Sequence, residues 1–254
     1  MNTMDDLQPP SLAEFVRARR LRPTPDDSSG LSRQQLAAAI HSSVGYLAKI
    51  EQGEARNPSP SVLDALAEAL TLTPDERRHL YHLAQQHIPD ASSSCDVDDA
   101  LLETDLDALT PHPAAVLDRG WQILASNTAF EAAFPGLPAK GNALTWMFTD
   151  PRARLVMEEW EREADQMVGR FRACAARSVT NDLTSPLLRA LAPNPDFHRL
   201  WTTGHVYQSR PSPALHLRNR KTGHPYTIHL QRLRTRTHKL LLGLPVGREE
   251  PQRE

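Results

Sequence analysis

The 254-residue sequence has only two cysteines, Cys95 and Cys174, which is too few for a disulfide framework or a four-thiolate zinc site. No stretch approaches the roughly 18 consecutive apolar residues of a membrane-spanning helix, so we expect no membrane association. The opening residues, MNTMDDLQPP, lack the basic start and apolar run of a secretory signal, which makes the cytoplasm the expected compartment. Net charge is also nearly absent, at −2.

Motifs of enzyme chemistry are missing as well. The sequence contains no glycine-rich phosphate loop, no Gly-x-Ser-x-Gly turn and no His-Glu-x-x-His pair. His79 and His82 stand three residues apart, but two ligands are too few for zinc and no third is evident. We therefore predict that the protein is not an enzyme, and we expect no catalytic residues, no cofactor and no metal.

Charge is unevenly distributed along the chain. Residues 86–107 contain seven acidic residues and no Lys or Arg, whereas residues 197–248 contain ten basic residues and no acidic one. Charge of a single sign together with small polar residues is typical of a linker. The predicted regions are a helical domain at 1–88, an acidic linker at 89–105, a second domain at 106–247 and a disordered tail at 248–254.

Five short helices are predicted in the first domain. Capping boxes begin at Ser11, Ser32 and Thr73, each with Glu or Gln three residues later. Pro60 and Pro74 stand at first helical positions, and apolar residues then recur at helical spacing. The expected helices span 11–20, 32–40, 43–52, 60–70 and 74–86.

The second domain mixes strands and helices in an α+β order, with an antiparallel sheet. Two strands are expected within 114–125, and three more at 214–220, 226–233 and 239–244. Between them the sequence predicts a short helix at 128–134, one long helix from Pro151 to about Arg177, and helices beginning near Ser185 and Asp196.

The helices at 32–40 and 43–52 are separated by only His41 and Ser42. A connection this short forces the second helix to cross the first steeply, as in a helix-turn-helix whose second helix can enter a DNA major groove. The stretches LSRQQLAAAI from Leu31 and SVGYLAKIEQG from Ser43 resemble the xenobiotic-response-element type of helix-turn-helix, which has the phage-repressor fold.

The residues that follow make this resemblance more specific. Residues 57–67, NPSPSVLDALA, resemble the actinobacterial subset in which the helix-turn-helix is joined to an MmyB-like ligand-binding domain. The best single match is NALTWMFTDPRA from Asn142, and PDFHRLW from Pro195 is a further one. The resemblance covers roughly residues 11–245. It implies a transcription regulator with a PAS-like second domain that contains a hydrophobic pocket.

The resemblance also implies which residues meet DNA. By this resemblance, residues at the start and on the outer face of the 43–52 helix contact base edges. Arg33, at a position where the family usually has glutamine, contacts a backbone phosphate. His41 replaces the usual turn glycine, and histidine tolerates a left-handed conformation better than most residues. The expected DNA-binding residues are Arg33, Ser43, Val44, Gly45, Tyr46 and Lys49.

Glu51 stands where the family places a buried carboxylate that faces an arginine near the end of the first helix, and Arg20 fits that position. The alternative is a solvated surface pair that contributes under about 1 kcal/mol. We expect the buried pair, because burying either charge alone is costly.

A PAS-like sheet with one helical layer leaves room for a lined pocket. Core packing is the competing interpretation for its aromatic candidates. The basic residues of 197–248 have three interpretations: the solvated face of a sheet, a contact with DNA phosphates or the acidic linker, or a contact with an anionic ligand head group. The candidate pocket residues are Trp121, Ile123, Phe130, Phe134, Trp146, Phe148, Trp160, Trp201, His216, Arg218 and His229.

The sequence thus predicts a DNA-binding transcription regulator. Its expected partners are double-stranded DNA, a second copy in a homodimer, and a small apolar, fatty-acid-like ligand in the C-terminal domain. The alternative is a DNA-binding protein whose C-terminal domain is a protein-interaction or dimerisation module without a small-molecule ligand. A third interpretation is an unrecognised enzyme fused to a DNA anchor.

Overall fold

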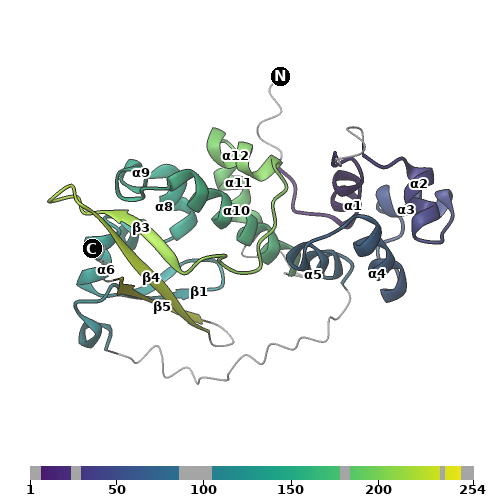
Figure 1. Ribbon diagram of the computed structural model, residues 1–254. Helices are drawn as coiled ribbons and strands as arrows, with labels where there is room; N and C mark the ends of the chain where they lie inside the picture. The colour runs from purple at the N-terminus through teal and green to yellow at the C-terminus, as the bar shows by residue number, and fades with distance from the viewer. Residues whose placement is uncertain (1–6, 24–29, 86–104, 178–183, 235–237, 247–254) are drawn as a thin grey trace, which may run out of the picture. The chain divides into compact units, whose positions relative to one another are not determined.

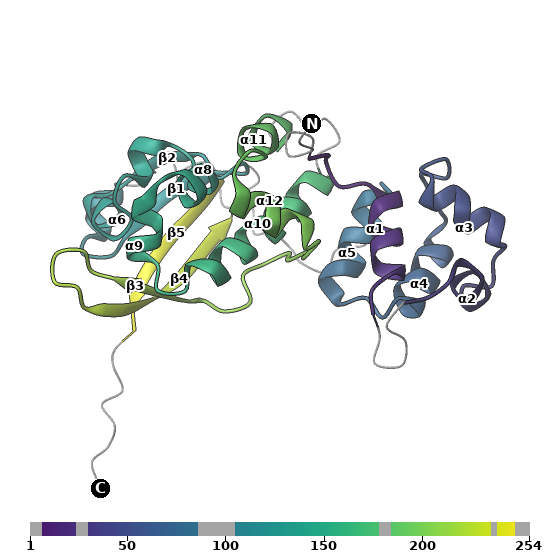
Figure 2. The same ribbon diagram turned by 90° about the horizontal axis from the view of Figure 1, so that it is seen from above.

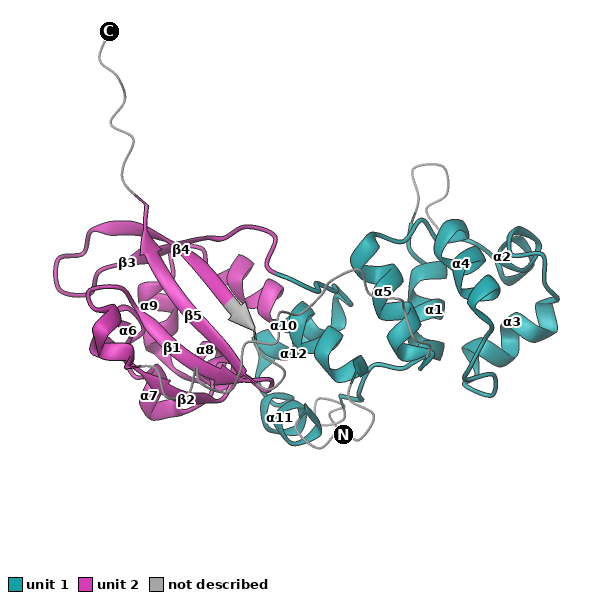
Figure 3. Ribbon diagram, turned by 90° about the horizontal axis from the view of Figure 1, so that it is seen from below, with its two compact units in different colours: residues 1–90, 168–209 teal, residues 91–167, 210–254 magenta. Residues whose placement is uncertain are grey.

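The computed structural model describes residues 7–23, 30–85, 105–177, 184–234 and 238–246. It has two compact units, coloured separately in Figure 3. The first unit combines residues 1–90 with 168–209, and the second combines 91–167 with 210–254. Residues 168–209 therefore share a unit with the N-terminal helices, although the sequence prediction groups them with the second domain. The predicted tail and nearly all of the predicted linker lie outside the described residues.

The N-terminal helices lie where their capping signals predict them (Figure 1). Ser32 forms a complete capping box, because its hydroxyl accepts from the Gln35 amide at 3.2 Å and the Gln35 side chain accepts from the Ser32 amide at 2.7 Å. His41, in the turn, has a φ of 52°, which is the left-handed conformation that the missing glycine suggests. The helices are α1 (Leu12–Arg20), α2 (Arg33–Ala39), α3 (Val44–Glu51), α4 (Pro60–Ala69) and α5 (Pro74–Leu83).

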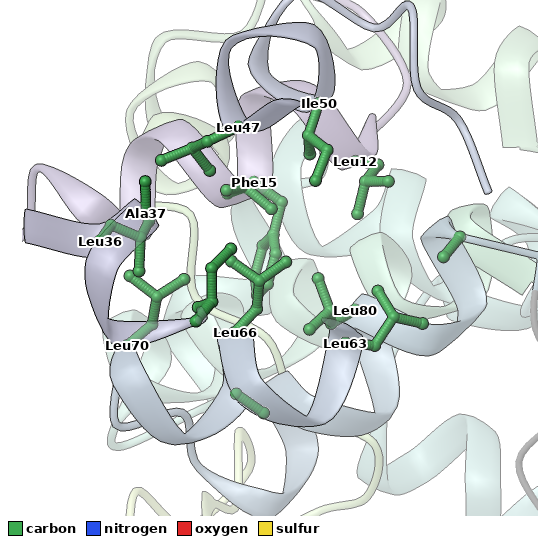
Figure 4. Close-up of a cluster of buried hydrophobic side chains, with 14 of the residues drawn as sticks. Leu12, Phe15, Leu36, Ala37, Leu47, Ile50, Leu63, Leu66, Leu70 and Leu80 are labelled. Atoms are coloured by element: carbon green, nitrogen blue, oxygen red, sulfur yellow. The ribbon is translucent and has the colours of Figure 1, made fainter. Parts of the chain in front are cut away.

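These helices enclose one apolar core, shown in Figure 4. Leu36 from α2, Leu47 and Ile50 from α3, and Leu63 and Leu66 from α4 are all 0% exposed. Burying each such side chain contributes about 1.5–3 kcal/mol. The core therefore fixes which face of α3 points inward, and by exclusion which face is left for a partner.

The second unit contains a five-stranded antiparallel sheet in the order β2-β1-β5-β4-β3. Strand β1 pairs with β5, the last of the described strands, so that Ala115 lies opposite Leu241. On β3, Leu215 and Leu217 are buried while Arg218 is exposed, so the strand has one buried and one more exposed face. The strands are β1 (Ala114–Asp118), β2 (Ile123–Ser126), β3 (Ala214–Arg218), β4 (Pro225–Arg234) and β5 (His238–Pro245).

Three short helices lie over one side of this sheet (Figure 2): α6 (Thr128–Ala133), α8 (Ala143–Thr149) and α9 (Pro151–Val156). Helix α7 (Leu137–Lys140) stands between α6 and α8 in the chain. A 3-10 helix, η3 (Leu106–Leu109), packs its Leu106 against Ala114, Val116 and Leu240. The remaining helices are α10 (Trp160–Arg177), α11 (Thr184–Leu191) and α12 (Pro195–Thr202). The sequence patterns do not predict η3, α7 or α8.

The prediction of a single long helix from Pro151 to about Arg177 is wrong, because α9 ends at Val156. Met157 is extended (φ −92°, ψ 112°) and pairs with Leu217 at the edge of β3. The Glu158 amide donates to the carbonyl of His216 at 3.1 Å. The sheet edge thus takes up backbone groups that would otherwise continue the helix, and α10 starts afresh at Trp160.

The predicted buried pair between Arg20 and Glu51 is confirmed. Arg20 Nε and Nη2 donate to the two carboxylate oxygens of Glu51 at 2.5 and 3.1 Å, and the Glu51 side chain is 0% exposed. Burial alone would raise the pKa of Glu51, but hydrogen bonds from Arg20 and Arg33 outweigh it and hold that pKa below its ordinary value. The carboxylate is therefore charged and joins α1 to α3.

His79 of α5 is fully buried, and neither ring nitrogen has a hydrogen-bond partner among the described residues. Its ring meets that of Phe15 edge-on, with 5.1 Å between the ring centroids. The pKa of His79 is lowered from 6.5 to about 3, mainly by burial and in smaller part by nearby positive charge. The charged groups around it are Arg172 and Arg177 of α10, His82 of α5 and Arg19 of α1.

We predict that His79 makes folding sensitive to acid. The unfolded imidazole has a pKa of about 6.5, so its contribution to stability is complete above that pH and is lost as the pH falls from 6.5 toward 3. At about pH 5 the loss is about 2 kcal/mol. Urea unfolding of the wild type and of His79→Leu at about pH 7.5 and about pH 5 checks this, since the variant should lose less stability by that amount. An equal pH dependence of both proteins would contradict it.

A second prediction concerns Glu51. Glu51→Gln leaves the buried Arg20 without a charged partner and should lower the free energy of unfolding by about 3–5 kcal/mol. Arg20→Met should cost less, because Arg33 still pairs with Glu51. The double variant should cost less than the sum of the single changes, since neither charge is then stranded. Urea melts of the four proteins measure this, and strict additivity would show that the pair carries no coupling.

Candidate nucleic-acid interface and ligand site

Helix α3 has one buried face and one exposed face. Leu47 and Ile50 point into the core, whereas Gly45 and Lys49 are exposed and Val44 is 43% exposed. This separation follows from the helical repeat, because residues three and four apart share a face. The outer face is free of the apolar packing that holds the helix in place.

Two of the predicted DNA-binding residues also serve the helix itself. The Ser43 hydroxyl accepts from the Tyr46 amide at 3.1 Å and caps the start of α3. Tyr46 is half-buried and packs against the N-terminal core. This cap is not among the predictions from the sequence, although a serine directly before a helical apolar pattern is the usual signal for one.

Arg33 is the first residue of α2, and its side chain is 46% exposed. Its Nε donates to Glu51 at 2.7 Å. A guanidinium has five N–H donors and Glu51 takes one of them, so the exposed part of the group retains donors for an anion. This bond to Glu51 is not among the predictions from the sequence, where its only signal is an arginine at a position that is usually glutamine in the family.

Gly45 is the second residue of α3, and a Cβ at this position would meet no atom within 4 Å. Neither a left-handed turn nor close packing inside the chain requires glycine here. A glycine within a helix costs about 0.5–1 kcal/mol relative to alanine. The contacts of Gly45 within the described residues give no reason for glycine at this position.

In the second unit, the aromatic candidates form two packed groups. The ring of Phe134 lies between those of Phe130 and Trp146, at centroid distances of 4.8 and 6.3 Å. Phe148 and Trp160 meet edge-on at 5.8 Å. All five are buried, and the indole N–H groups of both tryptophans donate to backbone carbonyls at 3.1 Å. This part of the predicted pocket is brought together, and its role in lining a pocket stays a prediction.

The other apolar candidates lie elsewhere. Trp121 follows β1 with a φ of 63°, and the ammonium of Lys239 lies 4.7 Å from its ring centroid. Ile123 is half-buried on the edge strand β2. Trp201 belongs to the first unit, where it stacks on Phe197 at 5.9 Å.

The basic candidates do not join the buried face of the sheet. His216 and Arg218 alternate with the buried Leu215 and Leu217 along β3, and so point to the opposite face. His216 Nδ1 lies 2.8 Å from the Thr227 hydroxyl. Arg218 is exposed and pairs with Glu158 at 2.6 Å. His229 on β4 is half-buried opposite Ala214, on the same face as His216.

No group of three or more His, Cys, Asp or Glu residues is placed to hold a metal ion in the part of the chain that the structure describes. Among the same residues, no helix combines the length and apolar character needed to cross a membrane.

Comparisons with known proteins match both the N-terminal helices and the domain that contains the sheet. The family model of a helix-turn-helix domain matches residues 11–80, which include α1 to α4 and most of α5. The family model of the MmyB-like transcription regulator ligand binding domain matches residues 98–246, which include every strand of the sheet. No curated protein matches the chain. Because the second match covers more than half of the sequence, the chain belongs to the MmyB-like transcription regulators and is a DNA-binding regulator with a helix-turn-helix domain and a ligand-binding domain.

Proposed function

We propose that α3 enters the major groove of double-stranded DNA, and that a homodimer of this chain regulates transcription without catalysing a reaction. The observation that carries the proposal is the outer face of α3, where Val44, Gly45 and Lys49 are exposed on a helix otherwise anchored in the core. A major groove about 12 Å wide accepts a helix of this kind.

The side chains of this face suit different parts of the groove. Lys49 offers a cation to the acceptor edge of guanine, and Val44 offers an apolar surface to a thymine methyl group. Arg33 meets a backbone phosphate while Glu51 holds its Nε, so the contact sets the position of α3 rather than the sequence read. Gly45 lets the helix backbone approach the base pairs closely.

Dimerisation follows from the limits of one such helix. A single helix reads only a few base pairs, and specific helix-turn-helix proteins bind two half-sites through a two-fold dimer. The net charge of −2 supplies no strong general attraction to DNA, so affinity depends on docking geometry and on the second copy.

We further propose that the ligand is a small apolar, fatty-acid-like molecule, bound in the second domain among aromatic residues such as Phe134 and Trp146. The match to a ligand-binding domain and the gathered aromatic rings support this. Native mass spectrometry of protein purified from its host tests it. A retained molecule of a few hundred daltons is the expected result, whereas a retained protein partner would favour an interaction module.

We predict that Lys49→Ala and Arg33→Ala weaken DNA binding in different ways. Lys49→Ala should reduce discrimination between selected and random duplexes by about 1–3 kcal/mol, because a base contact is lost. Arg33→Ala should weaken binding to both duplexes alike and lower the salt slope by about one. Fluorescence anisotropy at several salt concentrations measures both effects.

Arg17→Ala is the matched control for these variants, since it removes an exposed positive charge from α1 instead. Equal losses on both duplexes for Lys49→Ala would show that this side chain does not reach a base.

We predict that Gly45→Ala makes the protein more stable and a weaker DNA binder. Alanine should add about 0.5–1 kcal/mol to the free energy of unfolding, because the position is helical and a Cβ has open space. The same Cβ would stand between the helix backbone and the groove, and should reduce affinity for a selected duplex about tenfold or more. Urea melts and anisotropy measure the two quantities, and unchanged affinity would place Gly45 outside the interface.

A further inference from the structure

The segment 203–208, which follows α12, packs against the N-terminal helices although it lies inside the match to the ligand-binding domain. Val206 is 6% exposed and belongs to the same apolar cluster as Phe15 of α1 and Leu80 of α5. Ala173 of α10 is fully buried in that cluster as well. The core of the DNA-binding unit is thus completed by residues more than 80 positions further along the chain.

Polar contacts reinforce this packing on both sides of Val206. Arg19 of α1, which is 7% exposed and paired with Glu76 at 2.9 Å, donates from Nη2 to the carbonyl of Gly204 at 2.6 Å. Asp75 of α5 accepts from the Gln208 amide at 3.0 Å. The contact between Arg19 and Gly204 involves a buried charge. Its loss would leave a guanidinium donor of Arg19 without an acceptor, which costs more free energy than the loss of a surface contact.

Helix α10 also contacts this segment. Arg172 donates to the backbone carbonyls of Trp201 and His205, and its guanidinium carbon lies 4.5 Å from the Trp201 ring centroid. Gly169 lies directly against Tyr207, since a Cβ on Gly169 would come within 2.4 Å of that ring. Segment 203–208 therefore follows any displacement of α10.

Helix α10 is continuous from Trp160 to Arg177, and its first turn is anchored within the unit of the sheet. There the Trp160 indole donates to the carbonyl of Met147 at 3.1 Å. Glu163 forms a buried ion pair with Arg210, in which Arg210 Nη2 donates to Glu163 at 2.6 Å. One helix thus carries both the anchors of the ligand-binding domain and the residues that hold segment 203–208.

We propose that segment 203–208 is a regulatory joint: docked on α1 and α5 it favours DNA binding, and its release by the ligand-binding domain weakens binding. The inference rests on the proposed function. The direction follows from the placement of the contacts, since docking covers α1 and α5 and leaves the outer face of α3 exposed. Docking also stabilises α1, whose Arg20 holds α3 through Glu51.

Val206→Asp in the full chain tests the joint, because a carboxylate in an apolar cluster opposes docking. Ser209→Asp is the matched control, since it adds the same charge at a neighbouring exposed position. Hydrogen exchange should accelerate in peptides of both α5 and 203–208 for Val206→Asp and in neither for the control. Affinity for a duplex selected from random sequences should fall at least fivefold, the lower end of usual coupling between sites.

A reciprocal measurement separates coupling from simple stabilisation. Saturating the wild type with the selected duplex should slow exchange in the 203–208 peptide, which holds no residue of α2 or α3, because coupling between two sites acts in both directions. Val206→Asp should abolish this response. If Val206→Asp fails to fold, as judged by circular dichroism, Val206→Ala should give the same changes at smaller size.

The outcomes distinguish the joint from the proposed function. A wild type that binds no duplex at all would overturn both. A wild type that binds, with affinity unchanged in the folded Val206 variant or with no protection of 203–208 by DNA, would overturn the joint alone.

Discussion

A buried carboxylate sets the position of α3, the second helix of the helix-turn-helix. Glu51 is the last residue of α3, and its charge is removed from water, which is tolerated only with charged partners at hydrogen-bond distance. Arg20 supplies a bidentate contact from α1, and Arg33 supplies a third bond from α2. Three helices therefore meet at one side chain, and their crossing is set by directional bonds in addition to apolar packing, which by itself is non-directional.

Much of the fold could be predicted from local signals. Capping boxes and first-turn prolines located the N-terminal helices to within a few residues, because a helix start is decided by neighbouring residues. The break after Val156 was not predictable in this way. Met157 leaves the helical conformation to pair with Leu217, which lies 60 residues later in the chain, and helical periodicity contains no information about such a partner. The same limit concealed the grouping of residues 168–209 with α1 and α5.

The candidate site was likewise predictable where local sequence decides the structure and not where distant contacts do. Exposure of Lys49 and burial of Leu47 follow from the helical repeat, so the outer face of α3 could be inferred in advance. Burial of the aromatic residues was predictable from their type, but which of them pack together was not, since this depends on long-range packing. Trp201 stacks on Phe197 in the first unit, and His216 points away from the buried face of β3 because of strand register alone.

The order of the strands has a consequence for folding during synthesis. Ala115 and Leu241, which lie opposite each other in the central strand pair, are 126 residues apart along the chain. The contacts among α1 to α5 join residues that are close in sequence, and local contacts form faster than distant ones. A chain leaving the ribosome therefore possesses its helix-turn-helix long before β5 exists to occupy the centre of the sheet. The helix-turn-helix is synthesised first, Ala173 and Val206 later complete its core, and the sheet of the ligand-binding domain is completed only with β5.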